Sequence, residues 1–337
     1  MPIICATNAS AAAIAASAIS GATTISSGMT SVLDPGVLAR ADQLSRDFAG
    51  AKPFRHVVIE PFLDANFCAE LMAQFPLFDR EKALNESGEV AGKAVFSNLA
   101  DLGPAYARFD RLMQDPEFLA LTGRITGIPN LLYDPEYVGG GTHENLQGQE
   151  LDTHVDFNFH PTTQTHRRLN LILFLNPEWE QTWGGCLELL RDPFDAECET
   201  VVPLANRAVI FETTEASWHG FRQIQMPPEK DTSRRSIAVY FYTKEPPVAG
   251  AAPSHATFYY QRPMPGHLKP GRTLTDADVR EIEGLFARRD HYIRFLYQRE
   301  MKFTETLDKI IHSPTFRLAA QFAKVAKLVR GKNRDGA

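Results

Sequence analysis

The sequence has little of what a disulfide framework, a zinc ribbon or a membrane-spanning protein requires. Its 337 residues include only four cysteines, and Cys5, Cys68, Cys186 and Cys198 form no Cys-x-x-Cys pair. Such wide spacing argues against a structural zinc site and fits a reducing compartment. No run of about 18 consecutive apolar residues is present. We therefore expect no spanning helix and a cytoplasmic protein.

An excess of positive charge is also lacking. The formal net charge is −6, which gives no reason to expect nucleic-acid binding. The first lysine or arginine is Arg40, whereas a secretory signal needs a positive segment before its apolar one. Residues 1–45 are rich in Ala, Ser and Thr near their start, and we expect them to form a disordered leader. Translation from Met29 is an alternative start.

The central region is rich in short β-type runs. FRHVVIEPFL, from Phe54, reads as an entry strand, Asp64 as a helix N-cap, and about 105–125 as a further helix. From Leu131 to Pro246 the runs LNLILFL, CLELL, RAVIFET and SIAVYFYT alternate with turn clusters. This pattern predicts a sandwich or barrel rather than a parallel sheet. We expect one domain over residues 50–248.

The C-terminal region changes from a linker to helices. Residues 249–271 are rich in Pro and Gly, and we expect residues 272–337 to form a helical extension in which Thr275 and Asp278 make a capping box. Beyond Pro314 one helix face is apolar and the opposite one basic (Leu318, Phe322, Val325 and Val329 against Arg317, Lys324, Lys327 and Arg330). Such a helix more often docks on its own protein, and peripheral contact with an acidic membrane or a partner is the alternative.

Two histidines and one aspartate are the candidate metal ligands. His154 and Asp156 stand two residues apart in LDTHVDFNFH, and residues i and i+2 of a strand project from one face. A third ligand must come from elsewhere in the fold, and His219 lies beside an expected strand end. Two imidazoles and one carboxylate on one face of an ion leave three octahedral positions open, as Fe(II) oxygenases require.

An arginine at the start of a buried strand is the second part of the candidate site. The run RRSIAVYFYT begins with Arg234 and Arg235, 15 residues after His219. A guanidinium in a barrel core is costly unless it meets an anion, and a 2-oxoglutarate carboxylate can accept two parallel hydrogen bonds from it. His-x-Asp alone is a weak signal among ten histidines, so the arginine is what favours the metal interpretation.

These features resemble the prolyl-4-hydroxylase-like branch of the Fe(II)/2-oxoglutarate dioxygenases. The likeness runs from about residue 54 to 243: RRLNLILFLNPEW resembles the family's central strand, WGGCLELL its G-G-x-L strand, and NRAVIFET the strand before the distal histidine. It implies a mainly β fold with flanking helices (α+β), built on a double-stranded β-helix or jelly-roll core.

The resemblance also implies roles for individual residues. His154, Asp156 and His219 would bind Fe(II), and Arg234 would bind 2-oxoglutarate. Strand alternation places Arg234 on the inward face with Ser236, Ala238 and Tyr240, and Arg235 is the alternative if the strand is shifted by one residue. Tyr240 is a further candidate cosubstrate contact, and the same alternation turns two central-strand residues inward in that role. They are Asn170, whose alternative interpretation is a sheet-edge amide, and Phe174, where the family often has tyrosine.

Three other polar residues lie near the triad in sequence. His160, His166 and Arg167 stand on an expected loop, where they either touch substrate or form a solvated rim.

The implied activity is hydroxylation of a C–H bond in a peptidyl-prolyl, amino-acid or other small substrate. It would use Fe(II), 2-oxoglutarate and O2, release succinate and CO2, and accept ascorbate as a reductant. Asp156 argues against halogenation, because halogenating relatives have a small residue there. The alternatives are a zinc or manganese cupin-like hydrolase or isomerase, and a jelly-roll metal- or sugar-binding protein without 2-oxoglutarate turnover.

Overall fold

The chain divides into two compact units, residues 1–259 and 260–337. The computed structural model describes residues 31–79, 94–194, 198–247, 250, 252–260, 264–319 and 322. Met29 and Cys5 lie outside these ranges. Cys68, Cys186 and Cys198 are free thiols.

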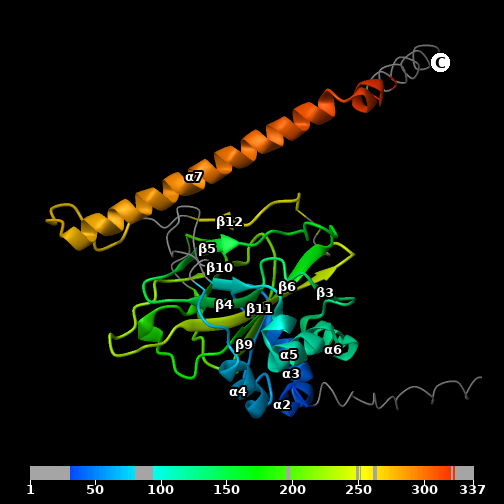
Figure 1. The fold of residues 1–337 in the computed structure, drawn as a ribbon, viewed down its shortest axis with the longest axis vertical. Helices are drawn as coiled ribbons and strands as arrows, with labels where there is room; N and C mark the ends of the chain where they lie inside the picture. Colours follow the sequence, from blue (N-terminus) through cyan, green and yellow to red (C-terminus); the bar gives the residue numbers. More distant parts are fainter. Residues whose placement is uncertain are drawn as a thin grey trace, which may run out of the picture. The chain divides into compact units, whose positions relative to one another are not determined.

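Two antiparallel sheets form the first unit (Figure 1). The larger has the order β1 (His56–Ile59), β9 (Ala208–Glu212), β6 (His166–Phe174), β11 (Arg234–Thr243), β4 (Gly141–Asn145) and β2 (Ala94–Phe96), with β3 (Leu132–Tyr133) beside β11. The smaller has the order β12 (Phe258–Tyr259), β5 (Leu151–Val155), β10 (Trp218–Phe221), β7 (Leu187–Leu190) and β8 (Glu199–Val201). The predicted mainly β class is confirmed.

Along the chain, strands β4 to β11 are distributed between the two sheets in near alternation. Along the chain, β4, β6, β9 and β11 belong to the larger sheet, and β5, β7, β8 and β10 to the smaller. Because the chain crosses repeatedly from one sheet to the other, the two sheets wind around a common interior, as in a double-stranded β-helix. Side chains of both sheets meet there, for example Ile172 and Phe174 with Leu187 and Leu189.

Helices cover the outer face of the larger sheet. They are α2 (Pro35–Ala39), α3 (Ala41–Gly50), α4 (Ala65–Ala73), α5 (Pro104–Gln114) and α6 (Pro116–Thr126), with the short 3-10 helices η1 (Leu99–Leu102) and η2 (Gln181–Trp183) elsewhere. Phe48, Phe109 and Phe118 pack with Ile237 and Phe241 in the largest core cluster. The helix expected over 105–125 is two helices, because Asp115 caps a second one that begins at Pro116.

The predicted disordered leader of residues 1–45 is wrong from residue 31 onward. Asp34 caps α2 by accepting a hydrogen bond from the Gly36 amide, and Pro35 occupies the first helical position. Leu44 and Phe48 of α3 are buried in the core. The apolar face of this segment is short, yet it packs against the sheet and so forms ordered helix. Residues 1–30 lie outside the described residues.

The second unit is dominated by one long helix, α7 (Asp276–Ile311). The predicted capping box is confirmed: the Asp278 amide donates to the Thr275 hydroxyl, and the Thr275 amide donates to the Asp278 carboxylate. Most of the basic helix expected after Pro314 lies beyond the described residues. Within the described part of the chain, no helix is both long and apolar enough to cross a membrane.

Candidate metal centre

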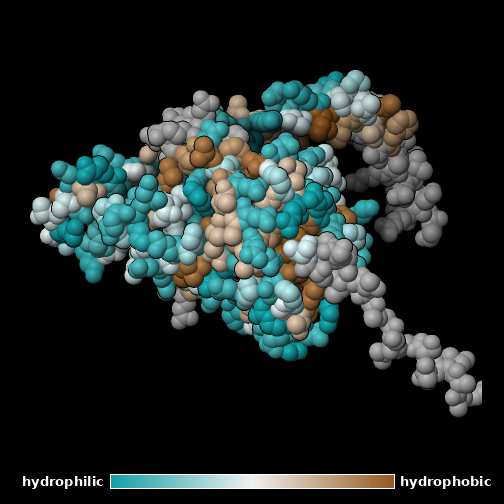
Figure 2. Space-filling view, turned by 60° about the horizontal axis from the view of Figure 1, so that its bottom comes forward, coloured by the Kyte–Doolittle hydropathy of each residue, from teal (hydrophilic) through white to brown (hydrophobic). Residues whose placement is uncertain are grey.

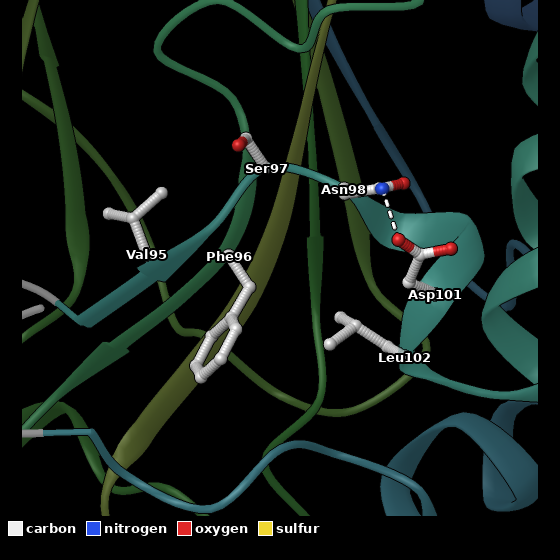
Figure 3. Close-up of a pocket in the computed structure, with 6 residues that line it drawn as sticks. All are labelled: Val95, Phe96, Ser97, Asn98, Asp101 and Leu102. Carbon is white, nitrogen blue, oxygen red and sulfur yellow. Dashed lines mark hydrogen bonds between the residues drawn. The ribbon is translucent and has the colours of Figure 1, made fainter.

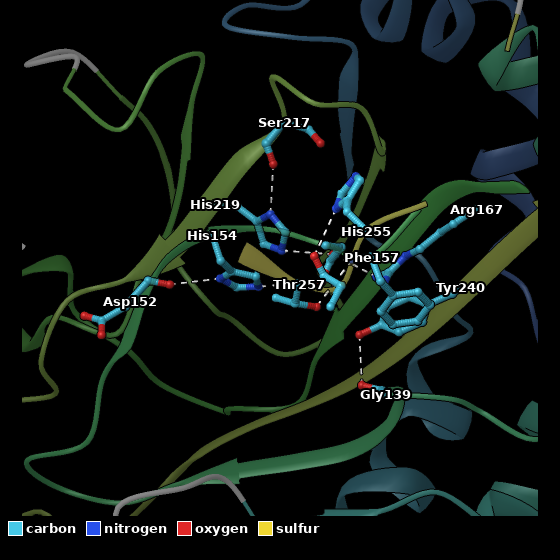
Figure 4. A network of polar contacts seen from close by, with 12 residues as sticks. Gly139, Asp152, His154, Phe157, Arg167, Ser217, His219, Tyr240, His255 and Thr257 are labelled. Atoms are coloured by element: carbon cyan, nitrogen blue, oxygen red, sulfur yellow. Dashed lines mark hydrogen bonds and ion pairs between the residues drawn. The ribbon is translucent and has the colours of Figure 1, made fainter. Parts of the chain in front are cut away.

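Strand pairing brings the two candidate histidines together. His154 of β5 and His219 of β10 are direct cross-strand partners, and their ring centroids lie 4.2 Å apart. Both are buried. Nδ1 of His154 donates to the Asp152 carbonyl at 2.9 Å, and Nδ1 of His219 donates to the Ser217 carbonyl at 3.0 Å (Figure 4). Since a carbonyl can only accept, each neutral ring carries its lone pair on Nε2, the atom a metal needs.

Asp156 completes the group. It follows β5 directly, and its carboxylate oxygens lie 3.7 Å from Nε2 of His154 and 3.4 Å from Nε2 of His219. One ligand atom from each of the three residues falls within 4.8 Å of the others. The structure therefore assembles two imidazole nitrogens and one carboxylate oxygen around a single point, in agreement with strand alternation and the distal histidine.

Arg167 holds Asp156 from the opposite side. Its Nη2 donates to Oδ2 of Asp156 at 2.8 Å, and its guanidinium lies between the rings of Tyr240, at 3.5 Å, and Phe157, at 4.6 Å (Figure 4). Burial is the largest single influence and would lower the pKa of Arg167, but the Asp156 charge together with the Tyr240 and Tyr242 hydroxyls outweighs it, so the pKa is raised. The positive charge of Arg167 is thus neutralised by Asp156, which is itself a candidate metal ligand.

Arg234 is also buried, but in different surroundings. Its Nε donates to the Gly185 carbonyl at 2.5 Å, and its guanidinium carbon lies 4.2 Å from the Phe221 ring centre and 5.2 Å from that of Phe174. Burial lowers the pKa of Arg234 to about 10. Among the described residues it has no carboxylate partner. A buried cation with no anionic partner among the described residues is costly to the fold, and an anion supplied by a ligand would lower that cost.

The two adjacent arginines of β11 face opposite ways. Arg235 is partly exposed and pairs with Glu144 at 3.1 Å. Ile237, Val239 and Phe241 share its face and belong to the core under the helices. Arg234 shares the inward face with Ser236 and Ala238, as alternation predicts. The strand register therefore places Arg234, and not Arg235, on the inward face of the sheet.

The three further cosubstrate candidates also point inward, with unequal surroundings. Phe174 is fully buried below Arg234. Asn170 is buried opposite Tyr240, and its Oδ1 has no hydrogen-bond partner. Tyr240 donates its hydroxyl to the Gly139 carbonyl at 2.9 Å and stacks on Arg167 rather than on Arg234. Asn170 is not a sheet-edge amide, because β6 is paired on both sides.

The expected placement of His166 and Arg167 on a loop is wrong. His166 and Arg167 begin β6, and an irregularity in the β6–β11 pairing next to Phe241 places Arg167 opposite Tyr242. A bulge of this kind redirects side chains, so period-2 counting from Leu169 cannot predict the direction of Arg167. His160 is buried and contacts Asp134 at 3.2 Å, so it is not a solvated rim residue.

Part of the expected linker reaches the candidate metal centre. Phe258 and Tyr259 form β12, which pairs with β5, and the Tyr259 ring lies 5.0 Å from the His154 ring. Thr257 accepts a hydrogen bond from the Phe157 amide at 3.3 Å. The sequence signal for this strand is only the short aromatic run FYY after a Pro-rich stretch, which is too brief to identify a strand.

A cavity and a second cluster of polar residues are less suited to be functional sites. A cavity of about 530 Å³ lies along β2 and η1 (Figure 3), but its polar pair, Asn98 and Asp101, is hydrogen-bonded internally, and none of the candidate metal ligands is among its described lining residues. In the second unit, His267, Asp278 and Glu281 also cluster. Asp278, however, already accepts from Thr275 and Arg272, as expected of a residue that caps a helix.

The candidate ligands all fall within a segment that matches a known family. Residues 141–242 match the model of the 2OG-Fe(II) oxygenase superfamily. Mouse (Mus musculus) prolyl 3-hydroxylase OGFOD1 is 29% identical over 103 residues, which cover 29% of this chain and 17% of that protein. The chain therefore spans only a small part of this curated relative.

The solved structures to which this chain is similar include two prolyl 4-hydroxylases. A Pseudomonas putida prolyl-4-hydroxylase is 19% identical with a TM-score of 0.43, covering 61% of this chain and all of the other. A Phytophthora capsici prolyl 4-hydroxylase is 17% identical with a TM-score of 0.42, covering 88% and 87%. The matched segment, which spans β4 to β11, is therefore similar to the 2OG-Fe(II) oxygenase superfamily, and part of it is similar to a prolyl 3-hydroxylase.

Proposed function

We propose that this chain is an Fe(II)- and 2-oxoglutarate-dependent hydroxylase whose metal ligands are His154, Asp156 and His219. The observation that carries the proposal is the combination of a two-histidine, one-carboxylate group with a buried arginine, Arg234, that pairs with no carboxylate in the described part of the chain. The ligand group alone would also suit zinc or manganese, and a buried arginine alone can serve packing. Together they provide for a metal and for the distal carboxylate of a dicarboxylate cosubstrate.

The donor set fits Fe(II). Both histidine tautomers are fixed by backbone carbonyls two residues earlier, so each presents Nε2 toward Asp156. Three protein ligands leave open positions on an octahedral ion, as an oxygenase needs. Iron held there would supply the activation of O2 for C–H hydroxylation, coupled to conversion of 2-oxoglutarate into succinate and CO2.

The protein's own side chains orient and enclose the reactants. Arg234 binds the distal carboxylate of 2-oxoglutarate and so fixes the direction in which the cosubstrate enters. Phe174 and Phe221 line its guanidinium and exclude water, which strengthens the ion pair. Arg167 holds Oδ2 of Asp156, which restricts rotation of the carboxylate about its side-chain bonds.

The substrate class we propose is a prolyl residue in a peptide, with a free amino acid or another small molecule as the alternative. The relative that matches the domain is a prolyl 3-hydroxylase, which supports the prolyl class. Ascorbate as reductant and a cytoplasmic location stay predictions from the sequence.

The test begins with the protein purified without oxygen and loaded with Fe(II). Addition of 2-oxoglutarate should produce a visible charge-transfer band, and admission of air should produce succinate. Asp156→Ala should abolish both signals, while Arg235→Met, which changes the outward-facing arginine of the same strand, should leave both in place. Mass spectrometry of prolyl peptides would then show an added oxygen atom.

A wild-type protein without the band would refute the proposal. Tight Zn(II) binding without the band would instead support a hydrolase or a binding protein. A normal band with succinate formation but no modified prolyl peptide would retain the oxygenase and reject the proposed substrate class.

A further inference from the structure

Helix α7 carries a seven-residue apolar repeat that the oxygenase chemistry does not use. Its first set of positions recurs every seven residues, and the second set follows three residues after each member of the first. The first set is Val279, Phe286, Ile293, Glu300 and Leu307. The second set is Ile282, Arg289, Leu296, Phe303 and Ile310. Alternating steps of three and four define the a and d positions of a coiled coil, and they extend through the whole helix.

This stripe is largely exposed. Phe286 is 57% exposed, Ile293 62% and Phe303 64%. Two neighbouring apolar side chains, Tyr297 and Ile311, are also exposed. In Figure 2, brown atoms appear on the surface of the segment that leads to the grey C-terminal residues. An exposed apolar stripe of this length marks an interaction surface rather than ordinary surface variation.

We propose that α7 pairs with α7 of a second copy of this chain as an antiparallel two-stranded coiled coil. Full overlap of two antiparallel helices places each a position beside a d position of the other copy. The resulting layers join Val279 with Ile310, Ile282 with Leu307, Phe286 with Phe303, Ile293 with Leu296, and Arg289 with Glu300. Every apolar residue of the seam meets an apolar residue.

Charge selects this orientation over the parallel one. The seam has one basic and one acidic residue, Arg289 and Glu300. In the antiparallel pair they face each other, twice by symmetry, and form opposite-charge layers. In a parallel pair Arg289 would face Arg289 and Glu300 would face Glu300, and like charges in a partly desolvated seam oppose pairing.

The contact is large enough for a stable dimer. Eight apolar seam residues on each copy, at roughly 100 Å² each, give on the order of 800 Å² per copy, the size of a standard specific interface. The helix is about 54 Å long at ~1.5 Å per residue. Its length therefore accommodates all the layers without a break.

Charge exchange in the full-length protein tests the pairing. Sedimentation velocity should show a wild-type dimer at micromolar concentration. Arg289→Glu and Glu300→Arg should each raise the dimer dissociation constant at least tenfold, because each creates two like-charge layers. The double exchange should restore dimerisation. Arg294→Glu, the same charge change off the seam, should have little effect.

Crosslinking tests the direction. Val279→Cys mixed with Ile310→Cys should form a disulfide between copies under mild oxidation, whereas Val279→Cys alone should not exceed the wild-type background. Efficient crosslinking of Val279→Cys alone would show a parallel pair and overturn the proposal. So would a wild-type monomer at all concentrations, including one whose α7 binds anionic phospholipid vesicles instead. Asp156→Ala should still dimerise, which separates this proposal from the enzymatic one.

Discussion

Arg167 and Arg234 sit at opposite ends of the inner face of one sheet, and they differ in what neutralises them. Arg167, at the start of β6, is paired with Asp156 and stacked between two aromatic rings. Arg234, at the start of β11, has aromatic neighbours and a backbone carbonyl, but no carboxylate of the described residues pairs with it. Burial acts on both, yet the pKa of Arg167 is raised and that of Arg234 is lowered.

The difference separates an arginine whose charge is balanced within the chain from one that we propose to bind the cosubstrate. The charge of Arg167 is balanced by a residue of the same chain, so its interaction exists before any ligand arrives. The charge of Arg234 is a cost to the fold until an anion binds. Removing Arg167 should therefore lower the free energy of unfolding, whereas removing Arg234 should leave it unchanged or raise it. Four predictions follow from this contrast, from the largest expected effect to the smallest.

The largest effect should follow Arg167→Met. Methionine fills the space between the rings but leaves Asp156 buried without a cation, and breaking a buried pair in this way costs about 3–5 kcal/mol of unfolding free energy. The melting temperature of the metal-free protein should fall by on the order of 10 °C. Mn(II) should raise it more in the variant than in wild type, because the ion supplies the missing positive charge.

Arg168→Met is the matched control for that variant. Arg168 is also buried and lies 3.4 Å from Glu212, but Glu212 keeps a second partner, Arg55, at 2.9 Å. Its loss should destabilise the protein less and leave the Mn(II) effect unchanged. Equal responses of the two variants to Mn(II) would show that Arg167 has no special relation to the metal centre.

Arg234→Met should weaken 2-oxoglutarate binding on the order of 100-fold, because a buried charge-assisted pair is lost. Without cosubstrate, the same variant should be as stable as wild type or more stable, since an unbalanced buried cation has been removed. Calorimetric titration with 2-oxoglutarate and a thermal melt without it measure the two effects. A less stable variant would mean that Arg234 has an internal anionic partner.

Gly185→Ala should produce a smaller change at the same arginine. A Cβ there would lie 2.8 Å from the Trp179 ring and 3.3 Å from the Arg234 side chain, at a backbone φ of +66°. The expected destabilisation is about 1–3 kcal/mol, and 2-oxoglutarate affinity should fall roughly tenfold as the guanidinium shifts. Gly148→Ala, with φ of +82° and no atom within 4 Å, measures the backbone strain alone.

Arg235→Met should have the smallest effect. The side chain is 41% exposed, and its partner Glu144 also accepts a hydrogen bond from Ser233. Loss of a partly exposed ion pair costs about 0–1 kcal/mol. Calorimetry should show an unchanged affinity for 2-oxoglutarate. A large loss of affinity would reverse the assignment of the two arginines.

The ligand group was accessible from the sequence because each part rests on a local rule. His154 and Asp156 share a face by strand alternation. Arg234 is distinguished from Arg235 because two small residues follow it at alternate positions, whereas large apolar residues follow Arg235 in the same way. The capping box of α7 likewise depends on four consecutive residues. Such rules involve near neighbours only, so no knowledge of the fold is needed to apply them.

Other parts of the site depend on contacts that no local rule describes. Arg167 faces Asp156 because of an irregular register against β11, and Tyr259 reaches His154 because β12 adds to the edge of β5. Residues 31–45 are ordered because a sheet formed by later residues buries Val37 and Leu44. In each case the partner is distant in sequence, and the interaction follows from packing.

The sequence by itself determined the chemistry of the centre: two histidines, a carboxylate and an inward arginine, with residue types and spacings that strand geometry converts into a shared face. Only the tertiary structure decided which of the two buried arginines, Arg167 or Arg234, has its charge balanced within the chain. Charge balance depends on through-space distance and burial, and the fold brings Arg167 within 2.8 Å of Asp156 while leaving Arg234 among aromatic rings. That is the physical reason why we assign Arg167 a structural role and propose that Arg234 binds 2-oxoglutarate.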